Sequence, residues 1–254
     1  MENLKKHLLE KGYVTFNIKD VFPNLIHNLE FVKNKTLNIN PWRLYISAVM
    51  SDAEHKDFEL WLIENVGNQV DWESRRYHKT QLNQVGYEIE INCPSWDVAD
   101  EIQNKINKDI IHTTQQYWFQ QPYWVIDEEG DDFIRNSVEI FDRVFSVFYD
   151  GSYSKDSNSK FALTNFRNGC HIHRHTDGQN PERVCGMLFY LNPDFNKDTG
   201  GCLILDDVEV PAEFGNVTIL DYTKNNLPHE VSQITENKNR FTLIKFFERN
   251  VRPI

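Results

Sequence analysis

The C-terminal part of the chain is a succession of short apolar runs, and this pattern constrains the fold more than any other feature. The runs cover residues 161–166, 184–191, 202–205, 217–220 and 241–247. Turn-forming residues lie between them, and short apolar runs with such boundaries are typical of the strands of a sandwich or jelly roll. The sequence therefore predicts a jelly-roll barrel over residues 151–254.

The N-terminal part follows a different pattern, because apolar residues there recur at helical spacing. Two stripes, over residues 98–110 and 134–148, each predict a long helix, and a capping box at 51–54 predicts the start of a further one. Helices with one apolar face need a sheet to cover. We therefore predict an α+β protein with a single domain, residues 1–254, in which a helix-rich support region, residues 1–150, packs on the major sheet of the barrel.

Composition narrows the classes of function. The formal net charge is −11 and no polybasic run is present. A protein that binds nucleic-acid backbones needs such basic clusters, so we expect no nucleic-acid partner. No apolar run approaches the ~18 residues of a membrane span, and no secretory leader pattern is visible, so we expect no membrane partner. The four cysteines lack CxxC spacing, which favours free thiols and a cytoplasmic location.

Three histidines and a carboxylate lie close together between His171 and Asp177. His175 and Asp177 are two positions apart, so on a strand their side chains point to the same face and can reach one metal ion. Further along the chain, His229 supplies a second histidine ligand beside His175. Two histidines and one carboxylate on one face of a divalent ion, with other positions open, form the arrangement of non-haem Fe(II) oxygenases. We therefore predict that His175, Asp177 and His229 are metal ligands.

A tri-histidine zinc site is the alternative, because His171 and His173 share strand parity with His175. Neither of these two histidines is followed two residues later by a carboxylate, and neither gives a role to Arg240. That arginine opens the last apolar run, where a fixed guanidinium can grip a carboxylate through two parallel hydrogen bonds.

An ordered set of motifs resembles the catalytic core of the 2-oxoglutarate/Fe(II)-dependent oxygenases, and within them the prolyl-4-hydroxylase-like branch. In chain order the motifs are His175-x-Asp177, MLFYLN at 187–192, TGGCL at 199–203, PHEV at 228–231 and RFT at 240–242. They span roughly residues 161 to 248. The resemblance implies a double-stranded β-helix, the jelly-roll barrel shared with cupins, with iron held by His175, Asp177 and His229.

The resemblance also implies which residues bind 2-oxoglutarate through its distal carboxylate. The residues assigned to this cosubstrate are Arg240, Tyr190, Thr242 and Asn165. Arg240 is the charged partner, Tyr190 the phenol, and Thr242 lies on the same strand face as the arginine. Where the family often has a tyrosine before the H-x-D motif, this chain has Phe166, so either Asn165 or Thr164 takes its place or the cosubstrate is bound more weakly.

The resemblance further implies the reaction. Oxidative decarboxylation of 2-oxoglutarate to succinate would accompany hydroxylation of an aliphatic carbon, in a prolyl residue or another amino-acid side chain, of a protein, a peptide or a free amino acid. The cofactors implied are Fe(II), 2-oxoglutarate and O2, with ascorbate as an accessory. Arg183 aligns with a family position at the substrate mouth, and His173 is a second candidate there. Related halogenases have glycine or alanine in place of the carboxylate, so Asp177 favours hydroxylation.

Two alternatives remain on the same barrel. One is a cupin-like metal enzyme that does not use 2-oxoglutarate, for which Arg240 would be dispensable. A cupin would also have a glutamate a few residues after His-x-His, and none follows His173 and His175 at that spacing. The other is a non-catalytic binding module, which an intact set of metal ligands disfavours.

Overall fold

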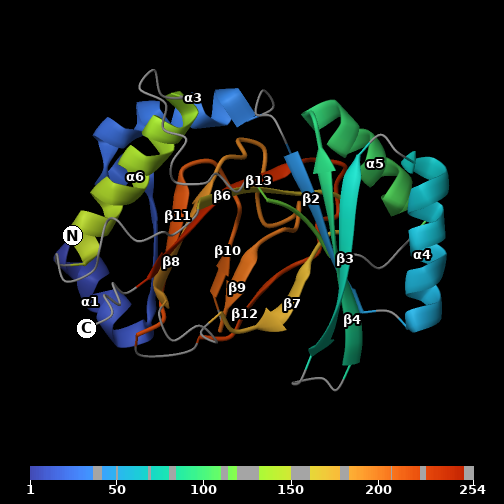
Figure 1. The fold of residues 1–254 in the computed structure, drawn as a ribbon. Coiled ribbons are helices and arrows are strands. Elements are labelled where there is room, and N and C mark those ends of the chain that lie inside the picture. Colours follow the sequence, from blue (N-terminus) through green and yellow to red (C-terminus); the bar gives the residue numbers. More distant parts are fainter. Residues whose placement is uncertain are drawn as a thin grey trace, which may run out of the picture.

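The computed structural model describes residues 1–36, 42–49, 51–67, 70–79, 84–109, 114–118, 132–149, 161–177, 183–206, 208–223 and 227–248. These residues form an α+β protein whose strands pair into three antiparallel sheets (Figure 1). The α+β class expected from the sequence is therefore confirmed.

The largest sheet has five strands in the order β1-β11-β8-β13-β6. Its strands are β1 (Tyr13–Asn17), β6 (Phe161–Phe166), β8 (Arg183–Tyr190), β11 (Asn216–Asp221) and β13 (Arg240–Glu248). All except β1 fall on the apolar runs that predicted strands. β1 pairs antiparallel with β11, with Tyr13 opposite Leu220. A strand from the N-terminal part of the chain is thus built into the same sheet as Arg240.

The second sheet has four short strands in the order β10-β9-β12-β7. They are β7 (Ile172–His175), β9 (Leu203–Leu205), β10 (Val208–Val210) and β12 (His229–Val231). The pairing of β12 with β7 sets His229 opposite His175. Residues of this sheet and of the largest sheet share one buried apolar cluster, which includes Leu205, Leu220 and Val231. The two sheets are therefore held together by a common core.

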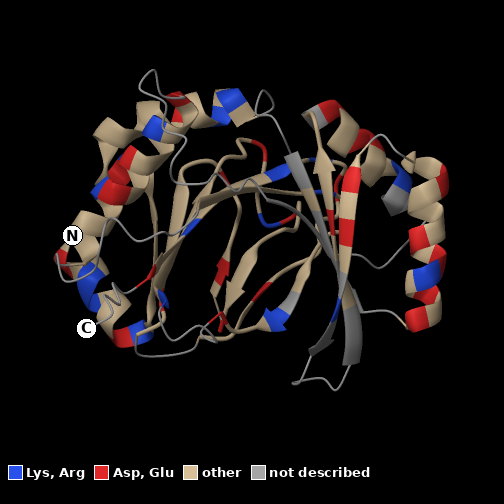
Figure 2. Cartoon of the chain, viewed as in Figure 1, with Lys and Arg blue, Asp and Glu red and all other residues tan. Residues whose placement is uncertain are grey.

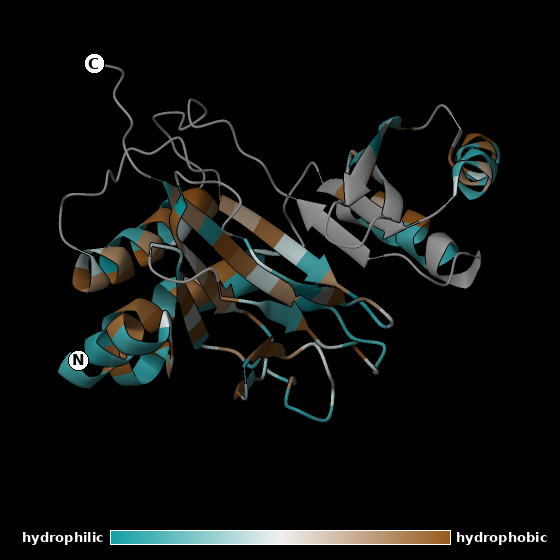
Figure 3. Ribbon diagram, turned by 90° about the horizontal axis from the view of Figure 1, so that it is seen from below, coloured by the Kyte–Doolittle hydropathy of each residue, from teal (hydrophilic) through white to brown (hydrophobic). Residues whose placement is uncertain are grey.

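Helices cover the other face of the largest sheet (Figures 1 and 3). They are α1 (Glu2–Lys11), α2 (Ile18–Val21), the 3-10 turn η1 (Pro23–Leu25), α3 (Ile26–Lys35) and α6 (Asp132–Phe148). The apolar stripe predicted over residues 134–148 is confirmed as the buried face of α6. Phe141 meets Phe189 of β8 edge-on at 5.2 Å, and Phe145 stacks on Phe247 of β13 at 4.1 Å between ring centroids. These aromatic contacts fix the helix on the back of the strands that carry the site.

Phe145→Ala is expected to destabilise the protein without touching the site. The side chain is 2% exposed and stacks on Phe247, so its removal leaves a cavity beneath α6. Such a change in a core reduces the free energy of unfolding by about 3–5 kcal/mol, which urea denaturation would measure. Arg143→Ala, on the exposed side of the same helix, should change it by no more than about 0.5 kcal/mol. Equal losses in the two variants would contradict this packing.

The third sheet was not expected, because the sequence analysis assigned residues 1–150 to a helix-rich region. Its order is β3-β4-β2-β5. The elements are β2 (Trp42–Val49), α4 (Asp52–Asn65), β3 (Asp71–Lys79), β4 (Gln84–Cys93), α5 (Trp96–Asp109) and β5 (Thr114–Trp118). The helix expected over residues 98–110 is α5, and it packs on β2 and β4 rather than on the largest sheet.

The sequence signal for this sheet is weak for a physical reason. On β3, Asp71 and Glu73 are exposed while Trp72 and Ser74 are half-buried, so few apolar residues mark the strand. Only one side of the sheet contributes to the core, through residues such as Leu44, Ile89 and Ile91. The capping box at the start of α4 is confirmed, with Ser51 and Glu54 bonded to each other's backbone. Figure 2 shows charged residues along the length of α4.

Two other expectations concern the whole chain. All four cysteines are buried and free, as predicted. None of the described helices combines the length and the apolar character that crossing a membrane requires.

Candidate metal and carboxylate site

Three ligand-type side chains converge where β7 and β12 lie side by side. His175 ends β7, Asp177 follows two residues later, and His229 begins β12. One ligand atom from each lies within 4.8 Å of the others. Nε2 of His175 is 3.5 Å from Oδ1 of Asp177, and Nε2 of His229 is 3.4 Å from Oδ2. The structure thus brings together the three residues that the sequence analysis selected as metal ligands.

The electrostatics of this cluster suit a cation. Nδ1 of His229 lies 3.0 Å from the carbonyl oxygen of Leu227. A carbonyl can only accept, so Nδ1 donates and the ring directs Nε2 toward the cluster. Burial alone would raise the pKa of Asp177, but hydrogen bonds and charge interactions with His175 and His229 outweigh it and hold that pKa well below its usual range. The carboxylate is therefore anionic and faces two imidazole nitrogens.

Tyr222 is a contact of this cluster that the sequence analysis did not select. Its hydroxyl donates a hydrogen bond to Oδ2 of Asp177 at 2.8 Å. The residue follows β11, two positions after Leu220, whose side chain lines the same cavity. Strand alternation from Leu220 was the signal that could have identified Tyr222.

A cavity of about 200 Å³ contains both the histidine–carboxylate cluster and Arg240. Its polar lining comprises Thr164, His175, Asp177, Arg183, His229 and Arg240. Its walls are apolar, with Leu188 and Ile244 from the largest sheet and Leu203 and Val231 from the second. A small organic acid with one end at the cluster and the other at the guanidinium would lie within a single cavity.

Arg240 is buried at the start of β13 and is 2% exposed. Its Nε donates to the carbonyl oxygen of Gly201 at 2.6 Å, and its Nη1 donates to Oγ1 of Thr242 at 3.0 Å. Its Nη2 has no hydrogen-bond partner among the described residues, and the same is true of the buried hydroxyl of Tyr190. Cζ of Arg240 lies 5.3 Å from the centre of the Tyr190 ring. Two buried donors close to each other without acceptors are suited to an anion.

Burial acts on both of these groups. It lowers the pKa of Arg240 and raises the pKa of Tyr190. The guanidinium still remains charged and the phenol neutral at physiological pH, because their ordinary values lie far above it. A hydrogen bond donated to a carboxylate would therefore stabilise both groups.

The other residues assigned to the cosubstrate occupy different positions. Thr242 is fully buried behind the guanidinium and accepts a hydrogen bond from it, so it holds Arg240 without lining the cavity. Asn165 is not part of the cavity lining, and its amide donates to Oδ1 of Asn239 at 3.1 Å. Its neighbours Thr164 and Phe166 line the cavity instead. Thr164 and Asn165 were the two candidates to replace the family's tyrosine, and of these only Thr164 lines the cavity.

Arg183 lies in the cavity lining at the start of β8, near Asp177. Its Nη1 donates to the backbone carbonyl oxygen of Asp177 at 3.3 Å, and its Cζ sits 4.1 Å from the centre of the Phe246 ring. Its Nε is buried without a hydrogen-bond partner among the described residues. The side chain of His173, the other substrate candidate, lies outside the described part of the chain.

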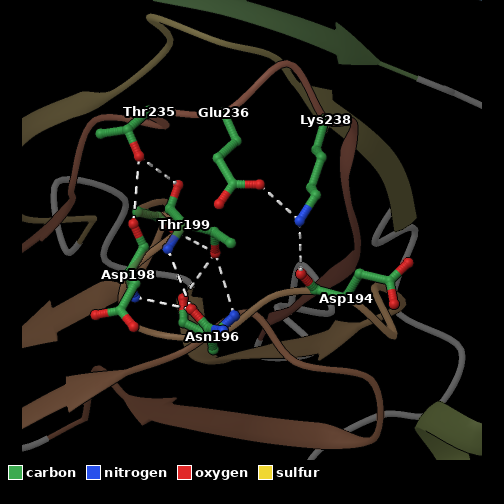
Figure 4. A network of polar contacts seen from close by, with 8 residues as sticks. Asp194, Asn196, Asp198, Thr199, Thr235, Glu236 and Lys238 are labelled. Carbon is green, nitrogen blue, oxygen red and sulfur yellow. Dashed lines mark hydrogen bonds and ion pairs between the residues drawn. The ribbon is translucent and has the colours of Figure 1, made fainter.

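A polar network fixes the turn that carries Gly201, the acceptor for Arg240 (Figure 4). The side-chain oxygen of Asn196 accepts from the backbone N–H groups of Asp198 and Thr199, at 2.9 and 3.2 Å. The hydroxyl of Thr235 donates to the carbonyl of Thr199 at 3.2 Å. The turn is thereby tied to the segment that leads into β13, so the acceptor and the guanidinium keep a fixed separation.

Gly200→Ala is expected to destabilise this turn strongly. Gly200 has φ of +71°, and a Cβ there would lie 2.0 Å from the backbone oxygen of Gln233, which cannot move aside. The left-handed conformation and the overlap together should reduce the free energy of unfolding by about 2–4 kcal/mol, measured by denaturant titration. Gly169→Ala is the control, because Gly169 has φ of +86° but no atom within 4 Å of the added carbon. Equal losses would show that overlap at Gly200 is unimportant.

Comparisons with known proteins fit this geometry. Residues 161–248 match the family model described as the 2OG-Fe(II) oxygenase superfamily. The chain is similar in fold to a Pseudomonas putida prolyl-4-hydroxylase, with 13% sequence identity, a TM-score of 0.52 and coverage of 98% of both chains. It is also similar to a Trichoplax adhaerens prolyl hydroxylase in complex with a hypoxia inducible factor oxygen degradation domain peptide fragment, with 14% identity, a TM-score of 0.52 and coverage of 97% of this chain and 88% of that chain. No curated protein matches the chain in sequence.

Proposed function

We propose that the chain is an Fe(II)- and 2-oxoglutarate-dependent hydroxylase, because residues 161–248 match the family model of the 2OG-Fe(II) oxygenase superfamily. The observation that carries this proposal is one cavity lined by two histidines, one carboxylate and a buried arginine. We propose further that the two C-terminal sheets form the jelly-roll barrel of residues 151–254, and that residues 1–150 support it within a single domain.

The donor set fits Fe(II). His175, Asp177 and His229 offer two imidazole nitrogens and one carboxylate oxygen, the set typical of non-haem iron oxygenases. His175 and His229 come from the paired strands β7 and β12, Asp177 follows β7, and all three line the same cavity. The hydrogen bond from Nδ1 of His229 to Leu227 orients that ring for coordination through Nε2.

The other end of the cavity fits the distal carboxylate of 2-oxoglutarate. Arg240 lines the cavity, and its Nη2 is a buried donor without an acceptor among the described residues, which a carboxylate would satisfy. The hydroxyl of Tyr190 is a second such donor; its ring lies beside the guanidinium, although Tyr190 is not part of the cavity lining. Thr242 and Gly201 accept from the same guanidinium and so fix its direction. Thr164 lines the cavity nearby and is our candidate for the hydroxyl that replaces the missing tyrosine, in place of Asn165.

Each side chain then has a defined task. The three ligands hold the metal, Arg240 and Tyr190 hold the organic acid, and the apolar walls limit the entry of water. The chemistry supplied by bound Fe(II) and 2-oxoglutarate is oxidation of a C–H bond by O2, coupled to loss of carbon dioxide. No side chain is required as a general acid or base, and ascorbate is proposed only as an accessory reductant.

The proposed substrate is an aliphatic carbon of an amino-acid side chain, with a prolyl residue of a peptide or protein as the first candidate and a free amino acid as the second. This rests on the resemblance to prolyl-4-hydroxylases and on the position of Arg183 in the cavity lining near Asp177. The two similar solved structures are named as prolyl hydroxylases, and one of them contains a peptide fragment. The four free cysteines fit the proposed cytoplasmic location.

The test is succinate formation from 2-oxoglutarate by the purified protein, with candidate peptides and amino acids screened in parallel by mass spectrometry. We expect succinate only when Fe(II) is present, and a product heavier by one oxygen atom. If Arg240→Ala left activity intact, a cupin-like enzyme without 2-oxoglutarate would replace this proposal. If calorimetry detected no binding of Fe(II) or Mn(II), a non-catalytic module would replace it.

A further inference from the structure

Tyr222 fixes one oxygen of the Asp177 carboxylate. A carboxylate can only accept, so the phenol donates to Oδ2 across 2.8 Å. The backbone of Tyr222 is itself anchored, because its N–H donates to the carbonyl of Val184 at 2.9 Å. The phenol therefore approaches the carboxylate from a fixed point on the largest sheet.

Gly186 provides the space that the phenol occupies. It lies inside β8, opposite Leu220 of β11 on one side and Phe246 of β13 on the other. A Cβ at this position would lie 2.6 Å from the hydroxyl oxygen of Tyr222 and 3.3 Å from a ring carbon of Phe246. A glycine inside a strand weakens it, and it often marks a close approach by another group. Here the approaching group is the hydroxyl that bonds Asp177.

The conformation of Gly186 does not account for a glycine. The described glycines with positive φ are Gly12, Gly67, Gly169, Gly200, Gly201 and Gly215, so Gly186 has backbone angles that any residue can adopt. A glycine at position 186 therefore provides space for the Tyr222 hydroxyl, and not an unusual backbone conformation. The pair of Gly186 and Tyr222 acts as a unit, because a larger residue at 186 would displace the hydroxyl.

The consequence concerns how Asp177 binds a metal. Tyr222 occupies one lone pair of Oδ2, which also lies 3.4 Å from Nε2 of His229, so Oδ1, 3.5 Å from Nε2 of His175 and not bonded by the phenol, is the oxygen better placed to bind an ion. A carboxylate that bound through both oxygens would occupy a coordination position that a three-ligand oxygenase site keeps open. The backbone of Asp177 is held separately, by Arg183, so only the direction of the carboxylate depends on the phenol.

We propose that Tyr222, seated in the space left by Gly186, is a positioning residue that keeps Asp177 a one-oxygen metal ligand. The inference rests on the proposed function, because it assumes that Asp177 coordinates the metal. It adds two residues, Tyr222 and Gly186, that neither the motif spacing nor the family resemblance selected.

The test is a double-mutant cycle with Mn(II) affinity as the readout. Partners that orient a metal ligand typically change affinity by 10- to 100-fold, so Tyr222→Phe should weaken Mn(II) by about that factor in calorimetry. Gly186→Ala should weaken it similarly by displacing the hydroxyl. The double variant should be no weaker than either single one, because the nearest Tyr222 atom that remains is 3.3 Å from the added carbon. Additive losses would overturn the proposal.

A second readout follows the geometry of the site directly. The visible spectrum of bound Co(II), which reports coordination number, should change in Tyr222→Phe and in Gly186→Ala in the same way. Tyr13→Phe, which removes a phenol on the neighbouring strand β1 outside the cavity lining, should leave both Mn(II) affinity and the Co(II) spectrum unchanged. Unchanged Mn(II) binding in Tyr222→Phe would overturn this inference alone. Absence of Mn(II) binding in the unaltered protein would instead overturn the proposed function.

Discussion

Replacing Asp177 with alanine is expected to abolish succinate formation and to weaken metal binding more than any other single change. Asp177 carries the anionic donor of the cluster, and both histidines face it at 3.4–3.5 Å. Four-ligand metal sites bind with roughly 10–16 kcal/mol, or about 2.5–4 kcal/mol for each ligand, which corresponds to a roughly 60- to 900-fold change in dissociation constant. Calorimetry with Mn(II) would measure that loss, and succinate release would measure turnover.

The control for Asp177→Ala is Glu230→Ala. Glu230 follows His229 directly on β12, but its side chain is not part of the cavity lining. Its removal also deletes one negative charge from the same neighbourhood, so it tests whether general electrostatic attraction explains metal binding. We expect Mn(II) affinity and turnover to stay within about twofold of the unaltered protein. The Glu230 carboxylate is outside the cavity, so salt screens its interaction with the metal. Full turnover in Asp177→Ala would contradict the assignment of Asp177 as a metal ligand.

Arg240→Met is expected to separate binding of the cosubstrate from stability of the fold. Leaving one partner of a buried charge pair unmatched typically costs about 3–5 kcal/mol, so affinity for 2-oxoglutarate should fall by a hundred- to several-thousand-fold. Without the cosubstrate two effects on the free energy of unfolding oppose each other. Methionine removes a buried charge whose Nη2 has no acceptor among the described residues, but it also leaves the carbonyl oxygen of Gly201 without its donor. We therefore expect the free energy of unfolding to change by less than about 3 kcal/mol.

Chemical denaturation with and without 2-oxoglutarate and Mn(II) measures both effects. At a hundredfold excess over its dissociation constant, the cosubstrate should stabilise the unaltered protein by about 2.7 kcal/mol and Arg240→Met hardly at all. Lys245→Met is the matched control, because Lys245 is a buried cation on the same strand β13 whose Nζ lies 4.9 Å from the centre of the Phe247 ring. That variant should keep its full response to 2-oxoglutarate. A loss in Lys245→Met equal to that in Arg240→Met would contradict a specific role for Arg240.

Local sequence patterns predicted only the part of the site that is close together in the chain. β7 ends at His175, so strand alternation does not extend to Asp177, and it was the short spacing of the two residues that predicted their proximity. The pairing of β7 with β12, which brings in His229, depends on long-range register that spacing alone does not determine. The ordered motifs, and not periodicity, selected that histidine.

Asn165 shows where alternation fails. Every residue of β6 is buried, so both faces of the strand are covered and the sequence does not mark which face borders the cavity. The choice between Thr164 and Asn165 therefore needed the structure. Tyr222 was missed for a related reason, since its role depends on the gap at Gly186 in a neighbouring strand. The third sheet was missed in part because its strand β3 carries few apolar residues.

The position of β1 has a consequence for how the protein is made. Asn17, at the end of β1, is hydrogen-bonded to Asn216 of β11, 199 positions later. At typical rates of synthesis of 5–20 residues per second, the early strand waits roughly 10–40 s for its partner to leave the ribosome. During that interval the strand lacks its native partner strand, so a chaperone that shields nascent chains would have its greatest effect there.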